Sequence, residues 1–192
     1  MKNKRYRFFL YIGITLFLLV GCSVNRTDGE HDPDKIHIMF ISSVPPSYQE
    51  VMVEYFEQYL TKEVNQGLEI EVSMNFASYD RLTVEIINRE VDVFVVDEFL
   101  ENILIDPYLL TPLDKFTERL PDHVDHTRFQ REDESNGEEN LYAIPLLDNH
   151  LFIQDLGLDL EEDLLVGVVN TSPHRDAAFQ LIEQLFLKEG MK

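Results

Sequence analysis

The stretch VDVFVV, residues 91–96, decides the fold class, because only Asp92 interrupts a run of β-branched and aromatic residues. A strand that is apolar on both sides is typical of the centre of a parallel sheet, where helices cover both faces. Residues 36–41 (IHIMFI) predict a first strand. The alternation of apolar and polar residues in 68–74 (LEIEVSM) predicts a second strand with one wetter face.

Two amphipathic segments separate these strands. After a break at 42–46 (SSVPP), Ser47 is predicted to cap the first helix, and Glu50 completes a capping box. The apolar residues of this helix have the spacing of one buried face, and they are Val51, Met52, Tyr55, Phe56, Tyr59 and Leu60. Residues 78–90 predict a second helix, whose inward residues are Leu82, Ile86 and Ile87. Together the segments predict a βαβαβ unit with right-handed crossovers.

The second half of the chain predicts shorter elements. Two short helices, an extended segment and a buried strand are expected at 99–104, 114–120, 141–147 and 164–169. The highly polar segment 122–140 is expected to be an exposed loop. Ser172 is predicted to cap the last helix, whose inward residues are Ala177, Ala178, Leu181, Ile182, Leu185 and Phe186. The pattern predicts the α/β fold class, with a mostly parallel sheet and helices on both faces.

The first 22 residues predict export. Residues 1–7 carry four basic side chains and no acidic one, and residues 8–20 form an apolar run of 13 residues. These are the charged and apolar regions of a secretory signal. A helix of this length covers only about 20 Å of a hydrocarbon core that is about 30 Å thick, which favours a cleaved signal over a permanent span. The alternative is an uncleaved anchor with an incidental cysteine.

The apolar run ends in Leu19-Val20-Gly21-Cys22, which resembles the bacterial lipobox. The resemblance implies that a diacylglycerol joins the Cys22 sulfur and that residues 1–21 are removed. Acyl chains such as palmitate would then hold the protein at the extracytoplasmic face of the cell membrane, since two or more chains anchor stably. Residues 22–35 predict a flexible tether, and 36–192 a single α/β domain.

The composition limits the classes of partner that the chain is expected to bind. Removal of residues 1–21 takes four of the 16 basic residues and none of the 36 acidic ones, which leaves a net charge of −24. This charge excludes nucleic acid and anionic lipid headgroups as partners. It suits cationic ligands or a salty exterior, or it simply keeps an exported protein soluble. Cys22 is the only cysteine, so the chain has no internal disulfide and no cysteine-based metal site.

The order of the elements resembles one lobe of the extracytoplasmic (type II) solute-binding proteins of ABC transporters. The segments that carry the resemblance are 91–97, 110–114 and 142–145. Residues 149–159 look like the family's entry into a second lobe, and 166–186 look like its return strand and following helix. Only residues 161–164 separate that entry from the return strand, which leaves no room for a second lobe.

The resemblance therefore implies a truncated, one-lobe relative. Its expected function is non-catalytic binding of a small solute for or beside an ABC transporter. The expected partners are the membrane, through the N-terminal lipid, and an ABC permease or another membrane protein. A protein-interaction, accessory or sensor module that kept the one-lobe scaffold is the alternative.

Ligands of open parallel sheets bind beyond the carboxyl ends of the strands. This rule selects five candidate ligand-binding residues at one rim of the sheet, Ser42, Ser43, Tyr79, Asp97 and Glu98. Tyr142 is a sixth candidate, expected near this rim. Hydroxyl groups and a helix N-terminus at this rim are suited to an anion or a sugar hydroxyl. The alternative is that residues 42–47 only turn and cap the chain.

The sequence contains no catalytic motif of the phosphate-loop, nucleophile-elbow or zinc-helix type. Asp97 and Glu98 are neighbours that face opposite sides of an extended chain, so they do not form an acid–base pair. His123 and His126 have a spacing that suits one helical face, but no third metal ligand is defined. We therefore expect no enzyme activity, no cofactor and no metal. A surface hydrolase is the most distant alternative.

Overall fold

The computed structural model describes residues 31–120, 124–147 and 150–186. Five strands form the main sheet, in the order β2-β1-β3-β7-β6. They are β1 (Lys35–Ser42), β2 (Glu69–Phe76), β3 (Val93–Asp97), β6 (Ile144–Leu146) and β7 (Leu164–Val168). β1 is parallel to β2 and β3, whereas β7 is antiparallel to both β3 and β6. Four of the five strands therefore point the same way, which confirms the predicted α/β fold with a mostly parallel sheet.

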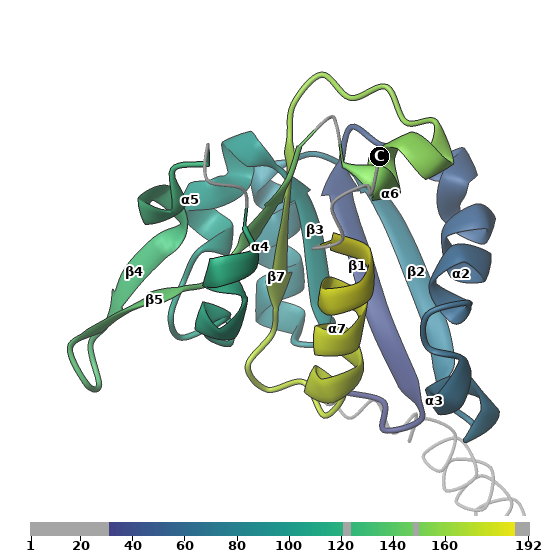
Figure 1. Ribbon diagram of the computed structural model, residues 1–192, viewed down its shortest axis with the longest axis horizontal. Helices are drawn as coiled ribbons and strands as arrows, with labels where there is room; N and C mark the ends of the chain where they lie inside the picture. The colour runs from purple at the N-terminus through teal and green to yellow at the C-terminus, as the bar shows by residue number, and fades with distance from the viewer. Residues whose placement is uncertain (1–30, 121–123, 148–149, 187–192) are drawn as a thin grey trace, which may run out of the picture.

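Helices cover both faces of this sheet, with α7 in front of it and α4 behind it (Figure 1). The α-helices are α2 (Gln49–Glu57), α3 (Thr61–Asn65), α4 (Tyr79–Asn88), α5 (Glu101–Leu104), α6 (Leu151–Leu156) and α7 (Arg175–Leu181). Four 3-10 helices are η1 (Pro46–Tyr48), η2 (Glu98–Leu100), η3 (Asp114–Arg119) and η4 (His126–Phe129), and a π-helical turn, η5 (Ile182–Phe186), follows α7. The side chains of Leu185 and Phe186 lie outside the described part.

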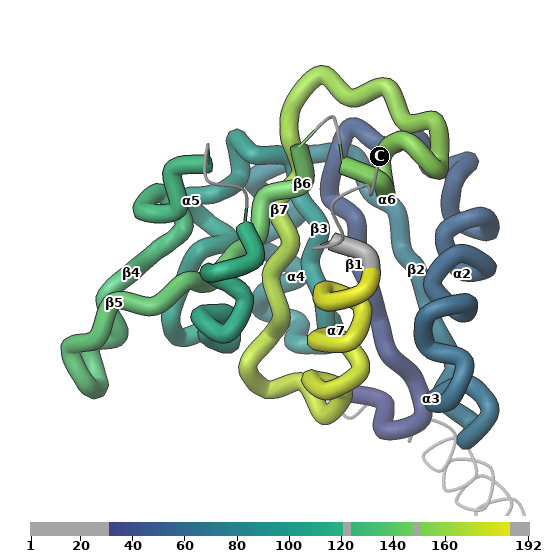
Figure 2. Tube along the Cα trace, in the orientation of Figure 1, coloured from purple at the N-terminus to yellow at the C-terminus, as the bar shows by residue number. Residues whose placement is uncertain are grey.

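An aromatic stack joins α2 and α6 to the sheet. The Phe56 ring lies 6.4 Å from the Phe40 ring of β1 and 6.0 Å from the Phe152 ring of α6. Tyr55 of α2 also donates a hydrogen bond of 2.9 Å to Asp155. Residues 151–156, within the segment that resembles an entry into a second lobe, therefore pack back on the same domain (Figure 2).

Two predicted helix caps are wrong. Residues Pro46–Tyr48 form η1, and α2 begins only at Gln49 without a side-chain cap, so the Ser47 capping box does not form. Ser172 is not the N-cap of α7, because the helix begins only at Arg175 and His174 occupies the cap position. The Ser172 hydroxyl accepts the N–H of His174 at 3.0 Å and donates to Asp92 at 2.5 Å.

The buried face of α4 also differs from the prediction. Leu82 is buried as expected, but Ile87 is 71% exposed, and Glu85 is buried in its place. Glu85 can be buried because Arg81, one turn earlier, holds its carboxylate at 2.7 Å.

The segment 122–140, which we expected to be a loop, contains η4 and a β-hairpin of β4 (Gln130–Asp133) and β5 (Glu138–Leu141). The turn closes at Gly137, whose φ of +74° suits glycine. The strands pair only with each other, and the hairpin projects from the main sheet (Figure 1).

The last residues of the predicted tether are not loose. His31 Nδ1 lies 3.1 Å from the Asp92 carboxylate, and His31 Nε2 lies 3.1 Å from the Thr171 hydroxyl. The ring of His174 also contacts the carbonyl oxygen of Asp32 at 2.9 Å. Residues 31–34 thus pack on the domain, whereas Cys22 and the predicted signal lie outside the described residues. No described helix is long and apolar enough to cross a membrane.

Candidate functional site

Five of the six candidate residues lie at the carboxyl ends of the parallel strands. Ser42 ends β1 and Ser43 follows it, Asp97 ends β3 and Glu98 follows it, and Tyr79 begins α4. β1 and β3 are neighbours in the sheet, so their ends meet. We call this end of the sheet, with these five residues and the two aromatic residues Phe76 and Phe99, the carboxyl rim.

Asp97 and the two serines hold the turn after β1. Both carboxylate oxygens of Asp97 accept the backbone N–H of Ser43, at 3.0 and 2.9 Å, and the Ser43 hydroxyl donates to the same carboxylate at 3.2 Å. The Ser42 hydroxyl accepts the N–H of Val44 at 3.3 Å. Burial raises the pKa of Asp97 despite these bonds. These contacts match the alternative in which the segment turns the chain, and they leave Asp97 only 4% exposed.

The accessible part of the carboxyl rim is aromatic. Phe76 is 77% exposed at the end of β2, where it is in register with Ser42. The rings of Tyr79 and Phe99 pack edge to face at 5.3 Å, and the Tyr79 hydroxyl donates to the Phe99 carbonyl at 3.2 Å. The strand-end rule selects Tyr79 from the sequence but not the two phenylalanines. The sequence signal for Phe76 and Phe99 is an aromatic residue at the end of a predicted strand, a position where packing of the core does not require an aromatic ring.

Glu98 lies in a small pocket of about 200 Å³ beside the carboxyl rim. Its carboxylate pairs with Arg128 at 2.5 Å, and Arg128 also holds Glu101 at 2.8 Å. The other lining residues are Val124, Asp125, Phe129, Pro145, Leu147 and Asp163. Arg128 lies in the segment expected to be a loop, so its position here was not predicted.

Tyr142 does not belong to the carboxyl rim, which corrects the prediction. Ile144 is level with Val95, because both pair with Val166 of β7. β6 runs in the same direction as β3, so Tyr142, two residues before Ile144, lies toward the amino end of β3. The Tyr142 side chain is buried, and burial raises its pKa.

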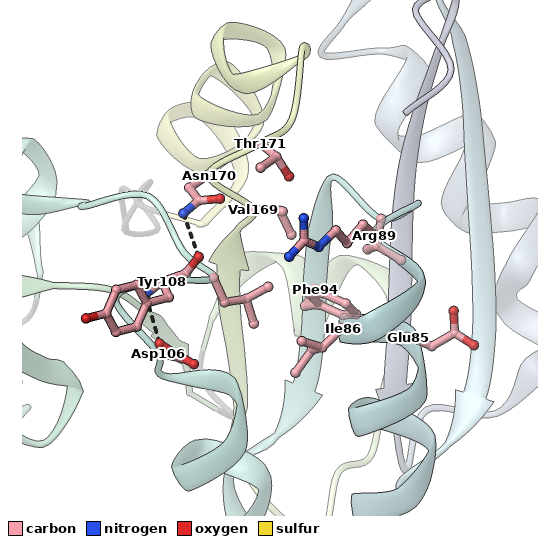
Figure 3. A pocket seen from close by; sticks show the side chains of 11 residues that line it. Glu85, Ile86, Arg89, Phe94, Asp106, Tyr108, Val169, Asn170 and Thr171 are labelled. Carbon is pink, nitrogen blue, oxygen red and sulfur yellow. Dashed lines mark hydrogen bonds between the residues drawn. The ribbon is translucent and has the colours of Figure 1, made fainter. Parts of the chain in front are cut away.

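A larger pocket, of about 320 Å³, opens at the other end of β3 (Figure 3). It lies between the C-terminal end of α4, residues 106–109 and the residues that follow β7. We call it the Arg89 pocket, after the side chain that points into it (Figure 3). None of the six candidate residues lines it.

A buried carboxylate, Asp92, lies next to the Arg89 pocket. It is 1% exposed and accepts the backbone N–H of His37 at 2.7 Å and the Ser172 hydroxyl at 2.5 Å. With the contact to His31, Asp92 joins β1, the residue before β3, the turn before α7 and the residues before β1. The sequence signal was the one acidic residue inside VDVFVV, which we did not interpret.

No metal centre is apparent in the described part of the chain, since no three His, Cys, Asp or Glu side chains there are grouped to hold an ion. His123 of the predicted histidine pair lies outside the described residues.

Comparison with known proteins finds similarity to a lipoprotein-like sequence and to a solved structure. A Bacillus subtilis (strain 168) protein described as "Putative lipoprotein YteS" is 25% identical over 183 residues, which cover 95% of this chain and 97% of that protein. In a crystal structure of cyclo/maltodextrin-binding protein complexed with maltotetraose, the aligned chain is 18% identical, with a TM-score of 0.38. That alignment covers 61% of this chain but only 29% of the binding protein. No family model matches the chain.

Proposed function

We propose that the chain is a membrane-anchored extracytoplasmic lipoprotein that binds a small solute, without catalysis, for or beside an ABC transporter. The observation that carries the binding proposal is the carboxyl rim, where exposed aromatic rings stand beside the strand ends at which ligands of open α/β sheets bind. Such rings offer flat apolar faces to the apolar side of a solute.

The lipid anchor has separate support. Only about a twentieth of the chain lies outside the match to the Bacillus subtilis protein, so the match includes Cys22. The printed description of that protein, "Putative lipoprotein YteS", agrees with the lipobox-like residues 19–22 of this chain.

The anchor is tested by blocking signal cleavage with globomycin in cells that express the full chain. The precursor should accumulate, and labelled palmitate should be incorporated by the wild type but not by Cys22→Ser. Equal labelling of the two proteins would refute lipidation at Cys22.

Solute binding is tested by thermal unfolding of the mature protein with sugars, peptides, metals and amines. A solute that binds the folded state raises the Tm. A Tyr79→Ala, Phe99→Ala double variant should lose that rise, whereas Ile87→Ala, an exposed apolar residue at the far end of α4, should keep it. A rise that survives the double variant would contradict binding at the carboxyl rim.

A protein-interaction module is the second candidate, and the openness of the carboxyl rim favours it. The adjoining pocket of about 200 Å³ is smaller than the roughly 300–1,000 Å³ of ordinary small-ligand sites. Phe76 and Tyr79 are more than half exposed, as expected where a second protein supplies the opposite wall. A protein crosslinked to wild type but not to the double variant, without any solute-induced rise in Tm, would favour this function.

A further inference from the structure

The backbone of Arg89 has an unusual conformation that directs its side chain. Among the described residues it is the one non-glycine residue with a positive φ, +56°, and it caps the C-terminal end of α4. Glycine is the usual residue in this left-handed position, because a side chain strains it. The guanidinium group extends from this turn into the Arg89 pocket (Figure 3).

The charge of Arg89 is not compensated. In the part of the chain that the structure describes, the exposed Arg89 side chain makes no ion pair or hydrogen bond, and the same holds for Arg175 on α7. Arg81, Arg119 and Arg128 each hold a carboxylate within 2.8 Å. Of the two unpaired arginines, Arg89 is the one that lines this pocket. Glu85, one turn before Arg89, also lines the pocket, but its carboxylate is paired with Arg81 at 2.7 Å. A chain of net charge −20 thus keeps an unpaired guanidinium in a pocket, where it can form two parallel hydrogen bonds to a carboxylate.

The opposite wall offers hydrogen-bond acceptors. The Asn170 amide nitrogen donates to the Tyr108 carbonyl at 2.7 Å, which leaves the Asn170 side-chain oxygen free to accept from a ligand. One carboxylate oxygen of Asp106 accepts the Tyr108 N–H at 2.8 Å, and the second has no partner among the described residues. Figure 3 shows Asp106 and Asn170 across the pocket from Arg89.

The floor between these two walls is apolar. It is formed by Val91, Phe94, Leu109 and Val169, of which all but Leu109 are buried. A pocket of about 320 Å³ accommodates a small organic molecule whose carbon skeleton lies on this floor.

We propose that the Arg89 pocket binds a small carboxylate that also carries a hydrogen-bond donor, a hydroxyl or an ammonium group. Arg89 binds the carboxylate, and Asp106 and Asn170 accept from the donor. The single positive charge of Arg89 opposite the Asp106 carboxylate favours a ligand with one negative charge over a phosphate dianion. This site goes beyond the proposed function, because it lies at the opposite end of β3 from the carboxyl rim.

The test is isothermal titration of the full lipoprotein in detergent micelles with four probes: lactate, alanine, propionate and inorganic phosphate. Lactate or alanine should bind more tightly than propionate, which lacks the donor, and more tightly than phosphate. A preference for alanine identifies an ammonium ligand, and a preference for lactate a hydroxyl ligand. Tighter binding of propionate or phosphate, or no binding of any probe, would overturn the proposal.

Two variants connect the binding to Arg89. Arg89→Gly removes the guanidinium and also relieves the left-handed strain, so it should raise the Tm while it weakens binding by about tenfold to a hundredfold. Loss of binding in this variant therefore cannot come from unfolding. Arg175→Gln removes the same charge from an exposed position on α7 and should leave the affinity unchanged. Equal affinities of Arg89→Gly and wild type would refute the assignment.

Binding of the probes at the Arg89 pocket does not depend on the carboxyl rim. The Tyr79→Ala, Phe99→Ala double variant should bind these probes with wild-type affinity, so failure of one site leaves the other open to its own test.

Discussion

Replacement of Asp92 by alanine should cost more stability than any other single polar substitution in the described part of the domain. Asp92 is 1% exposed and accepts hydrogen bonds from the backbone of β1 and from Ser172, at 2.7 and 2.5 Å. Its carboxylate also lies 3.1 Å from His31. Asp92→Ala leaves a buried backbone N–H of His37 and a buried hydroxyl without their acceptor.

The size of the effect follows from these contacts. A hydrogen bond to a charged group contributes about 1.5–3 kcal/mol, and two of them are lost together with the His31 contact. Part of the loss is regained, because the buried charge no longer has to be desolvated. We therefore expect the free energy of unfolding to fall by about 3–5 kcal/mol, which corresponds to a Tm decrease of roughly 6–20 °C for a domain of this size.

Urea unfolding of the mature Cys22→Ser protein, followed by circular dichroism, measures this loss. Ser172→Ala removes one of the donors and should cost about 1–2 kcal/mol by itself. In the Asp92→Ala background the same change should cost much less, because the bond is already lost. A loss below about 1 kcal/mol for Asp92→Ala, or full additivity of the two variants, would refute the central role of Asp92.

Three further predictions follow from individual contacts. Burial holds the pKa of Asp97 above its ordinary value. The folded state therefore binds this proton more tightly than the unfolded state, and the free energy of unfolding should decline as the pH rises through that pKa. Asp97→Asn should remove this decline in urea midpoints measured between about pH 4 and pH 7. Gly167→Ala would place a methyl group 2.8 Å from Leu110 Cδ1 and should cost about 1–3 kcal/mol in chemical unfolding, part of which Leu110→Val should restore. Arg128→Ala should cost less than about 1 kcal/mol despite two ion pairs, because the side chain is 47% exposed, and a larger loss in the same assay would show that solvent does not screen them.

The sequence predicted the elements whose patterns are local. VDVFVV is apolar on both sides, and it forms the central strand that helices cover from front and back. The periodic helix before it and the alternating strand β2 were found for the same reason. Each of these patterns reflects burial, which one segment of sequence can report.

The hairpin β4–β5 was missed because its residues are charged on both sides and pair only with each other. No apolar alternation marks such strands. The helix after Ser172 begins later than predicted, at Arg175, and the bond of Ser172 to Asp92 could not be predicted because it joins residues 80 positions apart. A serine next to a proline predicts a cap when only its neighbours are considered.

The candidate site was predicted in part. The rule that ligands bind at strand ends brought five residues together correctly in space, but Tyr142 was misplaced because the direction of β6 depends on its pairing with β7. Arg89 was not considered, since its importance comes from a left-handed turn and from the position of residues 106–109 across the pocket. Neither of these is visible in the residues around position 89.

The contacts of His31 limit how far the amino end of the sheet can lie from a lipid on Cys22. His31 is fixed at the amino end of β3, and it follows Cys22 by nine positions, a length of chain that spans at most about 30 Å. With a lipid on Cys22, the amino end of the sheet would lie no farther than this distance from the bilayer. The carboxyl rim is one strand length farther out, roughly 26 Å along the eight residues of β1. A lipid on Cys22 would therefore limit the distance of the Arg89 pocket from the bilayer more tightly than the distance of the aromatic rings at the carboxyl rim.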